Sequence, residues 1–123
     1  MNNYLLSILI PTYNRLSLLE ETLNSIFKDK ASEKVEVIVV DDGSNDETWS
    51  YLLFLKERHP NLKIYRHEKN LGVSAARNTA LSKATASYIM FLDSDDYLTE
   101  KALSRLLEEI KTKKEEVYLI SIW

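Results

Sequence analysis

Apolar and polar positions follow two different patterns along this chain of 123 residues. Short runs that are apolar at nearly every position and rich in β-branched residues predict strands buried on both faces. Longer segments with apolar residues three and four positions apart predict helices that pack along one side. The predicted strands cover residues 5–10, 35–40, 62–66, 88–92 and 117–123, and the predicted helices begin near residues 17, 46, 73 and 99.

Two local signals set the expected boundaries of the first elements. Pro11 follows the first apolar run, and it has no N–H to donate to a neighbouring strand, so we expect the first strand to end there. Ser17 and Glu20 have the spacing of a capping box, which predicts the start of the first helix.

The alternation of strands and helices predicts an α/β fold, with a mostly parallel sheet and helices on both faces. The length suits a single domain over residues 1–123. In such sheets ligands bind beyond the carboxyl ends of the strands, near a reversal of strand order. Polar clusters follow three of the predicted strands, at residues 12–14, 41–44 and 93–96. We therefore expect these clusters to gather at one edge of the sheet.

Composition narrows the classes of protein that fit. Hydrophobic residues make up 45% and charged residues 28%, which is ordinary for a globular domain. The net charge of −3 predicts no basic surface for nucleic acid, and the absence of cysteine excludes disulfides and thiolate metal sites. No apolar run approaches the roughly 20 residues of a membrane helix, and the N-terminus lacks the pattern of a signal peptide. These features predict a cytoplasmic domain without a membrane span.

Three carboxylates, Asp93, Asp95 and Asp96, directly follow the apolar run at 88–92. Like charges this close repel one another, and a hard divalent cation with oxygen ligands would offset that cost. Asp93 and Asp95 are two positions apart in an extended segment, so both side chains can face one ion. The alternative is a solvated turn in which Asp96 or Thr99 caps the next helix.

A cation held by two carboxylates keeps coordination positions for phosphate oxygens, so its expected ligand is a diphosphate. Asp42 can accept a hydrogen bond from a uracil or thymine N–H or from a ribose hydroxyl. Tyr13 offers a ring for base stacking, and Arg77 can bind a phosphate. The alternatives are that Asp41 and Asp42 serve only the turn at Gly43, that Tyr13 packs in the fold, and that Arg77 is solvated.

Four segments carry a resemblance to a known family. They are SILIPTYNR at 7–15, VIVVDDGS at 37–44, NLGVSAARN at 70–78 and FLDSDD at 91–96. In this order and spacing they resemble the nucleotide-binding half of the family-2 glycosyltransferases, which have the Rossmann-like GT-A fold. The resemblance covers essentially the whole chain.

The resemblance implies an enzyme whose donor is a nucleoside diphosphate sugar, most often a UDP-sugar, bound through Mn²⁺ or Mg²⁺. It implies that Tyr13 lies against the base, that Asp42 contacts the base ring, and that Arg77 lies near the diphosphate. Asp95 would be the direct metal ligand, and Asp93 would contact the ribose or a metal-bound water. The donor-site residues implied are Pro11, Thr12, Tyr13, Asn14, Asp41, Asp42, Arg77, Asp93 and Ser94, and the metal residues are Asp93 and Asp95.

The resemblance also implies transfer with inversion at the anomeric carbon, in which a carboxylate base activates the acceptor hydroxyl. Family members continue well past the metal motif, so we expect the base and the acceptor site in a later part that this chain lacks. The acceptor of the longer enzyme would be a glycan or a lipid-linked molecule, with the enzyme at the inner membrane face. The apolar run at 117–123 would then leave a sheet edge that favours a homodimer.

Three other functions fit parts of the pattern. The acidic pair at 41–42 is similar to that of response regulators, although they carry it after the first strand. Asp93 and Asp95 fit the nucleophile and acid of haloacid-dehalogenase phosphatases, which also place them after the first strand. A non-catalytic nucleotide-binding module is the third alternative. His59 and His67 lie at breaks between predicted elements and receive no role.

Overall fold

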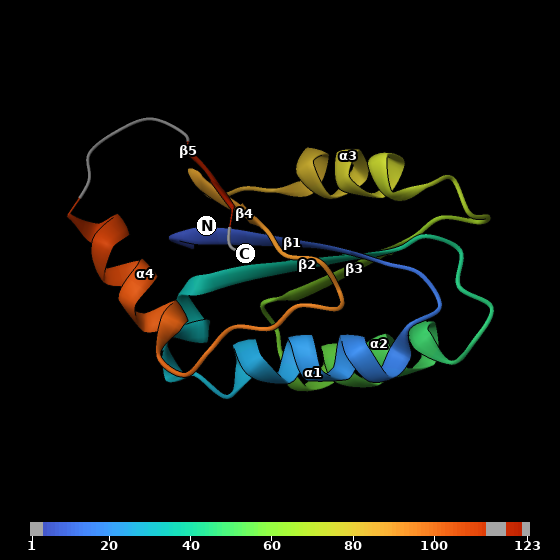
Figure 1. Ribbon diagram of the computed structural model, residues 1–123, viewed down its shortest axis with the longest axis horizontal. Coiled ribbons are helices and arrows are strands. Elements are labelled where there is room, and N and C mark those ends of the chain that lie inside the picture. Colours follow the sequence, from blue (N-terminus) through green and yellow to red (C-terminus); the bar gives the residue numbers. More distant parts are fainter. Residues whose placement is uncertain (1–3, 113–117, 122–123) are drawn as a thin grey trace.

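The computed structural model describes residues 4–112 and 118–121, in which five parallel strands form one sheet. The strand order is β3-β2-β1-β4-β5, and helices cover both faces, which confirms the predicted α/β fold (Figure 1). The strands are β1 (Leu6–Thr12), β2 (Val35–Asp41), β3 (Leu62–Arg66), β4 (Tyr88–Phe91) and β5 (Tyr118–Ser121). The helices are α1 (Leu16–Phe27), α2 (Thr48–Arg58), α3 (Val73–Lys83) and α4 (Ala102–Lys111), with a short 3₁₀ helix, η1 (Lys30–Lys34), that the sequence did not predict.

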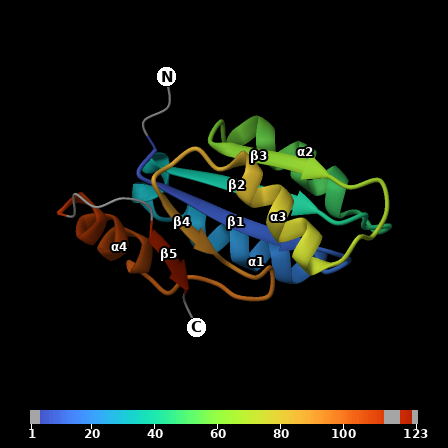
Figure 2. The ribbon, with the colours of Figure 1, turned by 90° about the horizontal axis from the view of Figure 1, so that it is seen from above.

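The two central strands, β1 and β2, are buried at every position because helices cover both of their faces. Helices α1 and α2 lie on one face and α3 on the other (Figures 1 and 2). Side chains alternate between these faces along each strand. In β1, Ile8 and Ile10 join the larger core on the α1 and α2 side, and Leu9 joins a smaller core with Ala76 and Ala80 of α3.

The strand order reverses at β1, which has β2 on one side and β4 on the other. The chain moves outward from β1 to β3 and then returns across the sheet through α3 to reach β4. Because parallel crossovers are right-handed, this return places α3 on the opposite face from α1 and α2. The reversal is the position at which ligands bind in sheets of this kind.

The predicted end of the first strand at Pro11 is wrong, because β1 continues to Thr12 and Pro11 pairs with Val40 of β2. The carbonyl oxygen of Leu9 accepts a hydrogen bond from the N–H of Leu92, so odd-numbered residues of β1 direct their backbone groups toward the β4 side. Strand β4 itself ends at Phe91. Pro11 therefore faces a side where no ladder partner needs an N–H.

Two predicted helix starts also differ from the structure. Helix α1 begins at Leu16 after Arg15, and no side chain caps it, so the predicted capping box is wrong. Helix α4 begins at Ala102 rather than near residue 99, because Lys101 adopts a left-handed conformation with φ of 65° that a right-handed helix cannot include.

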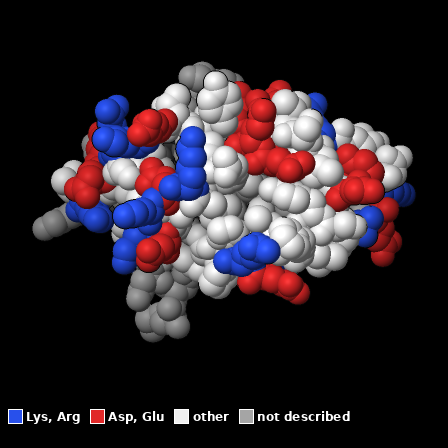
Figure 3. Space-filling view, turned by 90° about the horizontal axis from the view of Figure 1, so that it is seen from below, with Lys and Arg blue, Asp and Glu red and all other residues white. Residues whose placement is uncertain are grey.

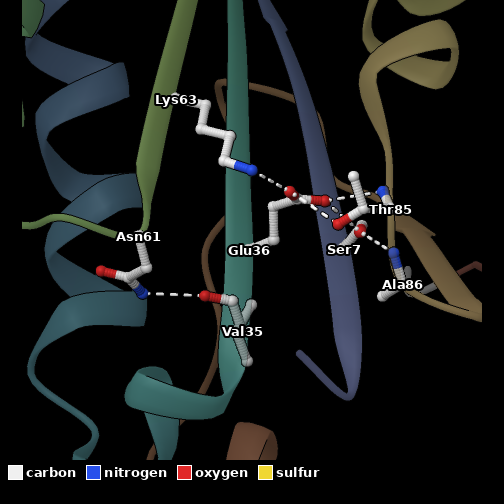
Figure 4. A network of polar contacts seen from close by, with 7 residues as sticks. All are labelled: Ser7, Val35, Glu36, Asn61, Lys63, Thr85 and Ala86. Atoms are coloured by element: carbon white, nitrogen blue, oxygen red, sulfur yellow. Dashed lines mark hydrogen bonds and ion pairs between the residues drawn. The ribbon is translucent and has the colours of Figure 1, made fainter. Parts of the chain in front are cut away.

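At the N-terminal end of the sheet, the fully buried carboxylate of Glu36 joins four segments of the chain (Figure 4). It accepts hydrogen bonds from the Ser7 hydroxyl at 2.7 Å, from Lys63 Nζ at 2.5 Å, and from the backbone N–H and the hydroxyl of Thr85 at 2.9 Å each. The Ser7 hydroxyl oxygen in turn accepts from the N–H of Ala86 at 3.1 Å. This network ties β1, β2 and β3 to the segment that leads into β4.

Charged side chains of both signs are interleaved on the face formed by α1 and α2, most densely at the end near α4 (Figure 3). This distribution is that of a mixed solvated surface. Among the described residues, no helix has the length and apolar character needed to cross a membrane.

Candidate functional site

A pocket of about 420 Å³ opens at the C-terminal edge of the sheet, at the ends of β1 and β4 and beside the start of α3. It therefore lies at the reversal of strand order, where the topology predicts a ligand. Every lining residue belongs to one of the four sequence segments singled out above. The lining residues are Pro11, Thr12, Tyr13, Arg15, Asp42, Asn70, Gly72, Val73, Ala76, Arg77, Asp93, Ser94 and Asp95.

Most of the residues predicted from the sequence for a donor and metal site meet in this pocket. They come from segments that are up to 84 residues apart in the chain (Pro11 to Asp95), and the parallel strands bring these segments to one edge. The predicted residues that line the pocket are Pro11, Thr12, Tyr13, Asp42, Arg77, Asp93, Ser94 and Asp95.

Two predicted site residues, Asn14 and Asp41, do not line the pocket: Asn14 connects the loops after β1 and β2, and Asp41 closes the turn after β2. Asn14 has a φ of 48°. Its N–H donates to the Ser44 hydroxyl, and its side-chain oxygen accepts from the N–H of Asn45, both at 2.9 Å. Asp41 is fully buried, and its Oδ1 accepts from the N–H of Ser44 at 2.9 Å. Both residues shape the loops that border the pocket.

Asp42 is almost fully buried, and its carboxylate accepts three hydrogen bonds from the segment after β3. The donors are His67 Nδ1 at 2.7 Å, the N–H of Leu71 at 3.0 Å and the N–H of Gly72 at 2.8 Å. Burial alone would raise the pKa of Asp42, but these hydrogen bonds outweigh burial and hold its pKa below the ordinary value of 3.8. Asp42 is therefore an ionised acceptor at the wall of the pocket.

The acidic loop after β4 brings carboxylate oxygens of Asp93, Asp95 and Asp96 within 4.8 Å of one another. Two arginines from different elements offset part of this charge. Arg77 of α3 donates from Nη2 to Oδ1 of Asp93 at 3.0 Å, and Nη1 of Arg15 lies 3.4 Å from Oδ2 of Asp95. The four side chains in these pairs remain 39% to 48% exposed, so solvent and ligands can reach them.

Helix α1 holds the backbone of the acidic loop in place. The Thr22 hydroxyl lies 3.0 Å from the carbonyl oxygen of Ser94 and also contacts the carbonyl oxygen of Asp96. One turn further along α1, the hydroxyl oxygen of Ser25 accepts from the N–H of Leu98 at 3.0 Å. These contacts go to backbone atoms of the loop and do not involve its carboxylates.

The donor set of this loop fits a hard divalent cation. It consists of three carboxylates with converging oxygens and no nitrogen or sulfur ligand, which is the set that Mg²⁺, Mn²⁺ and Ca²⁺ prefer. The alternative role, in which Asp96 or Thr99 caps the next helix, is wrong because no side chain caps α4.

Sequence reasoning gave no role to three residues that shape the site: Arg15, His67 and Thr22. Arg15 lines the pocket and pairs with Asp95, and His67 contacts Asp42. The parallel-strand rule was a signal for two of them, since Arg15 follows β1 and His67 follows β3 at the same edge of the sheet. For Thr22, whose loop partners lie more than 70 residues away, the sequence carries no local signal.

Comparisons with known proteins agree with this arrangement. A sequence model of glycosyl transferase family 2 matches residues 7–123. The chain is 33% identical over 113 residues to the uncharacterized glycosyltransferase EpsJ of Bacillus subtilis. This alignment covers 92% of this chain and 32% of EpsJ. It is 36% identical over 118 residues to the poly(ribitol-phosphate) beta-N-acetylglucosaminyltransferase TarS of Staphylococcus aureus. This alignment covers 94% of this chain and 20% of TarS.

Solved structures give the same result. The chain superimposes on S. aureus TarS 1-349 in complex with UDP-GlcNAc with a TM-score of 0.77 and 35% identity, over 91% of this chain and 32% of that one. It also superimposes on the mannosyltransferase PcManGT of Pyrobaculum calidifontis, in complex with GDP-Man and Mn²⁺. The TM-score is 0.75 and the identity 33%, over 87% of this chain and 31% of that one.

The chain spans between 13% and 42% of the length of the curated relatives it matches. The match nevertheless covers nearly all of this chain, and every residue that lines the pocket lies within the matched range 7–123. The response-regulator and phosphatase alternatives place their acidic residues after a first strand, whereas these acids follow β2 and β4. The chain belongs to glycosyl transferase family 2.

Proposed function

We propose that this chain forms the donor-binding part of a glycosyltransferase that takes a nucleoside diphosphate sugar, with a UDP-sugar as the expected donor. One observation carries the proposal: Tyr13, Asp42, Arg77, Asp93 and Asp95 line a single pocket. A base acceptor, an aromatic ring, a phosphate-binding cation and a metal-binding pair are the groups that such a donor requires.

The end of the pocket near β2 takes the nucleoside. Tyr13 is 41% exposed at the rim, where its ring is available to stack on a base. Asp42 is ionised and accepts a hydrogen bond from a base N–H, such as the imide of uracil. The UDP and UDP-GlcNAc complexes of TarS support uracil as the base.

The end of the pocket near β4 takes the diphosphate. Asp93 and Asp95 would hold a divalent cation, Mn²⁺ or Mg²⁺, and Ser94 lies between them in the pocket lining. When bound, such an ion supplies Lewis-acid stabilisation of the departing diphosphate. Arg15 and Arg77 add fixed positive charge beside these carboxylates and can bind phosphate oxygens. The Mn²⁺ in the mannosyltransferase complex supports a divalent ion here.

For the longer enzyme, we propose inverting transfer to an acceptor hydroxyl, with a carboxylate base from a part of the protein beyond these residues. A glycan or lipid-linked acceptor, a cytoplasmic location at the inner membrane face and a homodimer stay predictions from the sequence.

Calorimetric titration with UDP tests the donor site directly. We expect wild-type protein to bind UDP in the presence of Mn²⁺ or Mg²⁺ and to lose this binding when the ion is chelated. Asp95→Asn removes a metal carboxylate and should weaken UDP binding by about a hundredfold. Glu57→Gln, an exposed position on α2, is the matched control and should bind as wild type. Equal UDP affinity for wild type and Asp95→Asn would contradict the proposal.

A second measurement concerns turnover. We expect the 123-residue chain to bind donor but to transfer sugar poorly to an added acceptor, because the base is proposed to lie elsewhere. Efficient transfer by this chain would contradict that part of the proposal and leave the donor site intact.

A further inference from the structure

The carboxylate of Asp42 has nearly all of its hydrogen-bonding capacity occupied by the protein. Oδ1 accepts from His67 Nδ1 and from the N–H of Leu71, and Oδ2 accepts from the N–H of Gly72. An ionised carboxylate accepts about four hydrogen bonds, two at each oxygen. One acceptor direction, on Oδ2, therefore remains for a ligand in the pocket that Asp42 lines.

His67 is placed between Asp42 and α3. The side chain is 12% exposed, with Nδ1 at 2.7 Å from Oδ1 of Asp42 and Nε2 at 2.8 Å from the Thr79 hydroxyl. A carboxylate cannot donate, so Nδ1 must carry the proton. In a neutral ring Nε2 accepts from the Thr79 hydroxyl, and in a protonated ring it donates to the same oxygen. The Asp42 contact is preserved in both charge states.

We propose that His67, held by Thr79, is a positioning residue that fixes Asp42 for selection of the nucleobase. This inference rests on the proposed donor site. With Oδ1 occupied by His67 and Leu71, the free direction on Oδ2 favours a base that presents an N–H, such as uracil or guanine. Cytosine presents a lone pair at the corresponding ring nitrogen, which an ionised carboxylate repels.

The two backbone donors alone would hold Asp42 less well. Leu71 and Gly72 belong to a loop in which Leu71 is 54% exposed, whereas His67 follows directly on β3 and is hydrogen-bonded to Thr79 of α3. His67 therefore ties the carboxylate to the rigid part of the fold. Loss of the His67 donor would let the Asp42 side chain turn or take up a proton, and a protonated carboxyl can donate to the ring nitrogen of cytosine.

The first test compares UDP with CDP, which differ only in the base, by calorimetry in Mn²⁺. We expect wild type to prefer UDP, and His67→Leu to lower the ratio of UDP to CDP affinity by about tenfold, the loss of one charged hydrogen bond. His67→Asn places an amide nitrogen where Nδ1 lies and should keep most of the preference. Thr79→Val, which removes the partner of Nε2, should give a value between these two.

Other outcomes overturn the inference. One is that His67→Leu weakens UDP and CDP equally, which would indicate a purely structural role. Others are that wild type binds UDP and CDP alike, or that His67→Asn, folded by circular dichroism, loses as much preference as His67→Leu.

A second test needs no variant. Long-range ¹H–¹⁵N correlation of the imidazole in wild-type protein reports which ring nitrogens carry protons. We expect Nδ1 of His67 to be protonated in either charge state, and an unprotonated Nδ1 would overturn the inference.

These results separate the inference from the proposed function. If wild type binds UDP with metal and His67→Leu leaves the UDP preference unchanged, only the inference fails. If wild type binds no nucleoside diphosphate in Mn²⁺, both the proposed donor site and the inference about His67 are wrong.

Discussion

Glu36, at the N-terminal end of the central sheet, and the acidic loop of residues 93–96, at the C-terminal end, differ in how far the protein satisfies their carboxylates. At the N-terminal end, Glu36 is fully buried, and both of its oxygens are occupied by Ser7, Lys63 and Thr85. All of these partners come from the chain itself (Figure 4). No acceptor capacity is left there for a ligand.

At the C-terminal end, three carboxylates crowd together and remain accessible. Asp93 and Asp95 each have one arginine partner, and Asp96 has no ion pair among the described residues. The protein thus leaves these oxygens incompletely satisfied and half-exposed. The carboxylate of Glu36 is saturated from within and stabilises the fold, whereas the crowded, unsaturated carboxylates of the acidic loop are the ones that we propose bind a metal ion.

The largest expected effect comes from breaking the saturated network. Lys63→Met leaves the charge of Glu36 buried without its cation, which should lower the free energy of unfolding by about 3 kcal/mol at pH 7. Urea unfolding measures this change. Lys56→Met, at an exposed position on α2, is the control and should change stability by less than about 0.5 kcal/mol.

The double variant Lys63→Met/Glu36→Met sharpens the same point. It removes both charges, so much of the lost stability should return. If Lys63→Met alone cost no more than Lys56→Met, Glu36 would not depend on the network, and the comparison between the two ends would fail.

The loop that carries Asp42 should give the next effect. Gly43 has a φ of 79°, and an added Cβ would lie 2.6 Å from the carbonyl carbon of Lys69 and 2.7 Å from the nitrogen of Asn70. Gly72 has a φ of 101°, but a Cβ there meets no atom within 4 Å. Gly72→Ala should therefore cost only conformational strain, about 1–2 kcal/mol. Gly43→Ala should cost about 1 kcal/mol more than Gly72→Ala, because backbone must also move.

Thermal and urea unfolding of the two alanine variants check this order. Equal losses of stability would mean that the loops after β2 and β3 are not in close contact. Asp42 would then be held less firmly than its three hydrogen bonds indicate.

How much of the fold could be predicted from the sequence depends on how far apart in the chain the interacting residues lie. Strands β2 and β3 were predicted to within one residue, because runs of apolar residues report burial on both faces. The predicted end of β1 at Pro11 was wrong because the effect of a proline there depends on where β4 ends, some 80 residues later. Local sequence cannot report the length of a neighbouring strand.

The site shows the same limit. The parallel-strand rule brought Asp42 and Asp95 to one pocket from sequence alone. It could not show that Asp41 and Asp42, adjacent in the chain, take different roles, because that depends on which face of the sheet each side chain meets. His67 had no partner visible in the sequence, since Asp42 lies 25 residues earlier.

The dependence of stability on pH tests the buried Glu36 network. Burial alone would raise the pKa of Glu36, but hydrogen bonds from Lys63, Ser7 and Thr85 outweigh it and hold the pKa below its ordinary 4.5. The unfolded chain therefore binds this proton more readily than the folded chain. Its stabilising contribution is present above pH 4.5 and is lost as the pH falls through the folded value.

Urea unfolding from pH 7 down to pH 3 tests this direction. Glu36→Gln should flatten the decline of stability below pH 4.5 relative to wild type, and Glu57→Gln should keep the wild-type shape. An equally steep decline in Glu36→Gln would show that other carboxylates carry the acid sensitivity.

The smallest expected change in stability is also the most discriminating. Asp95→Asn removes one exposed ion pair with Arg15 and relieves repulsion from Asp93 and Asp96, so the two contributions nearly cancel. We expect the free energy of unfolding to stay within about 0.5 kcal/mol of wild type without metal, as urea unfolding would show. The same substitution is expected to weaken metal-dependent UDP binding by about a hundredfold. A loss of stability as large as that of Lys63→Met would mean that the acidic loop holds the fold together as Glu36 does, and the distinction between the two ends would no longer identify a site.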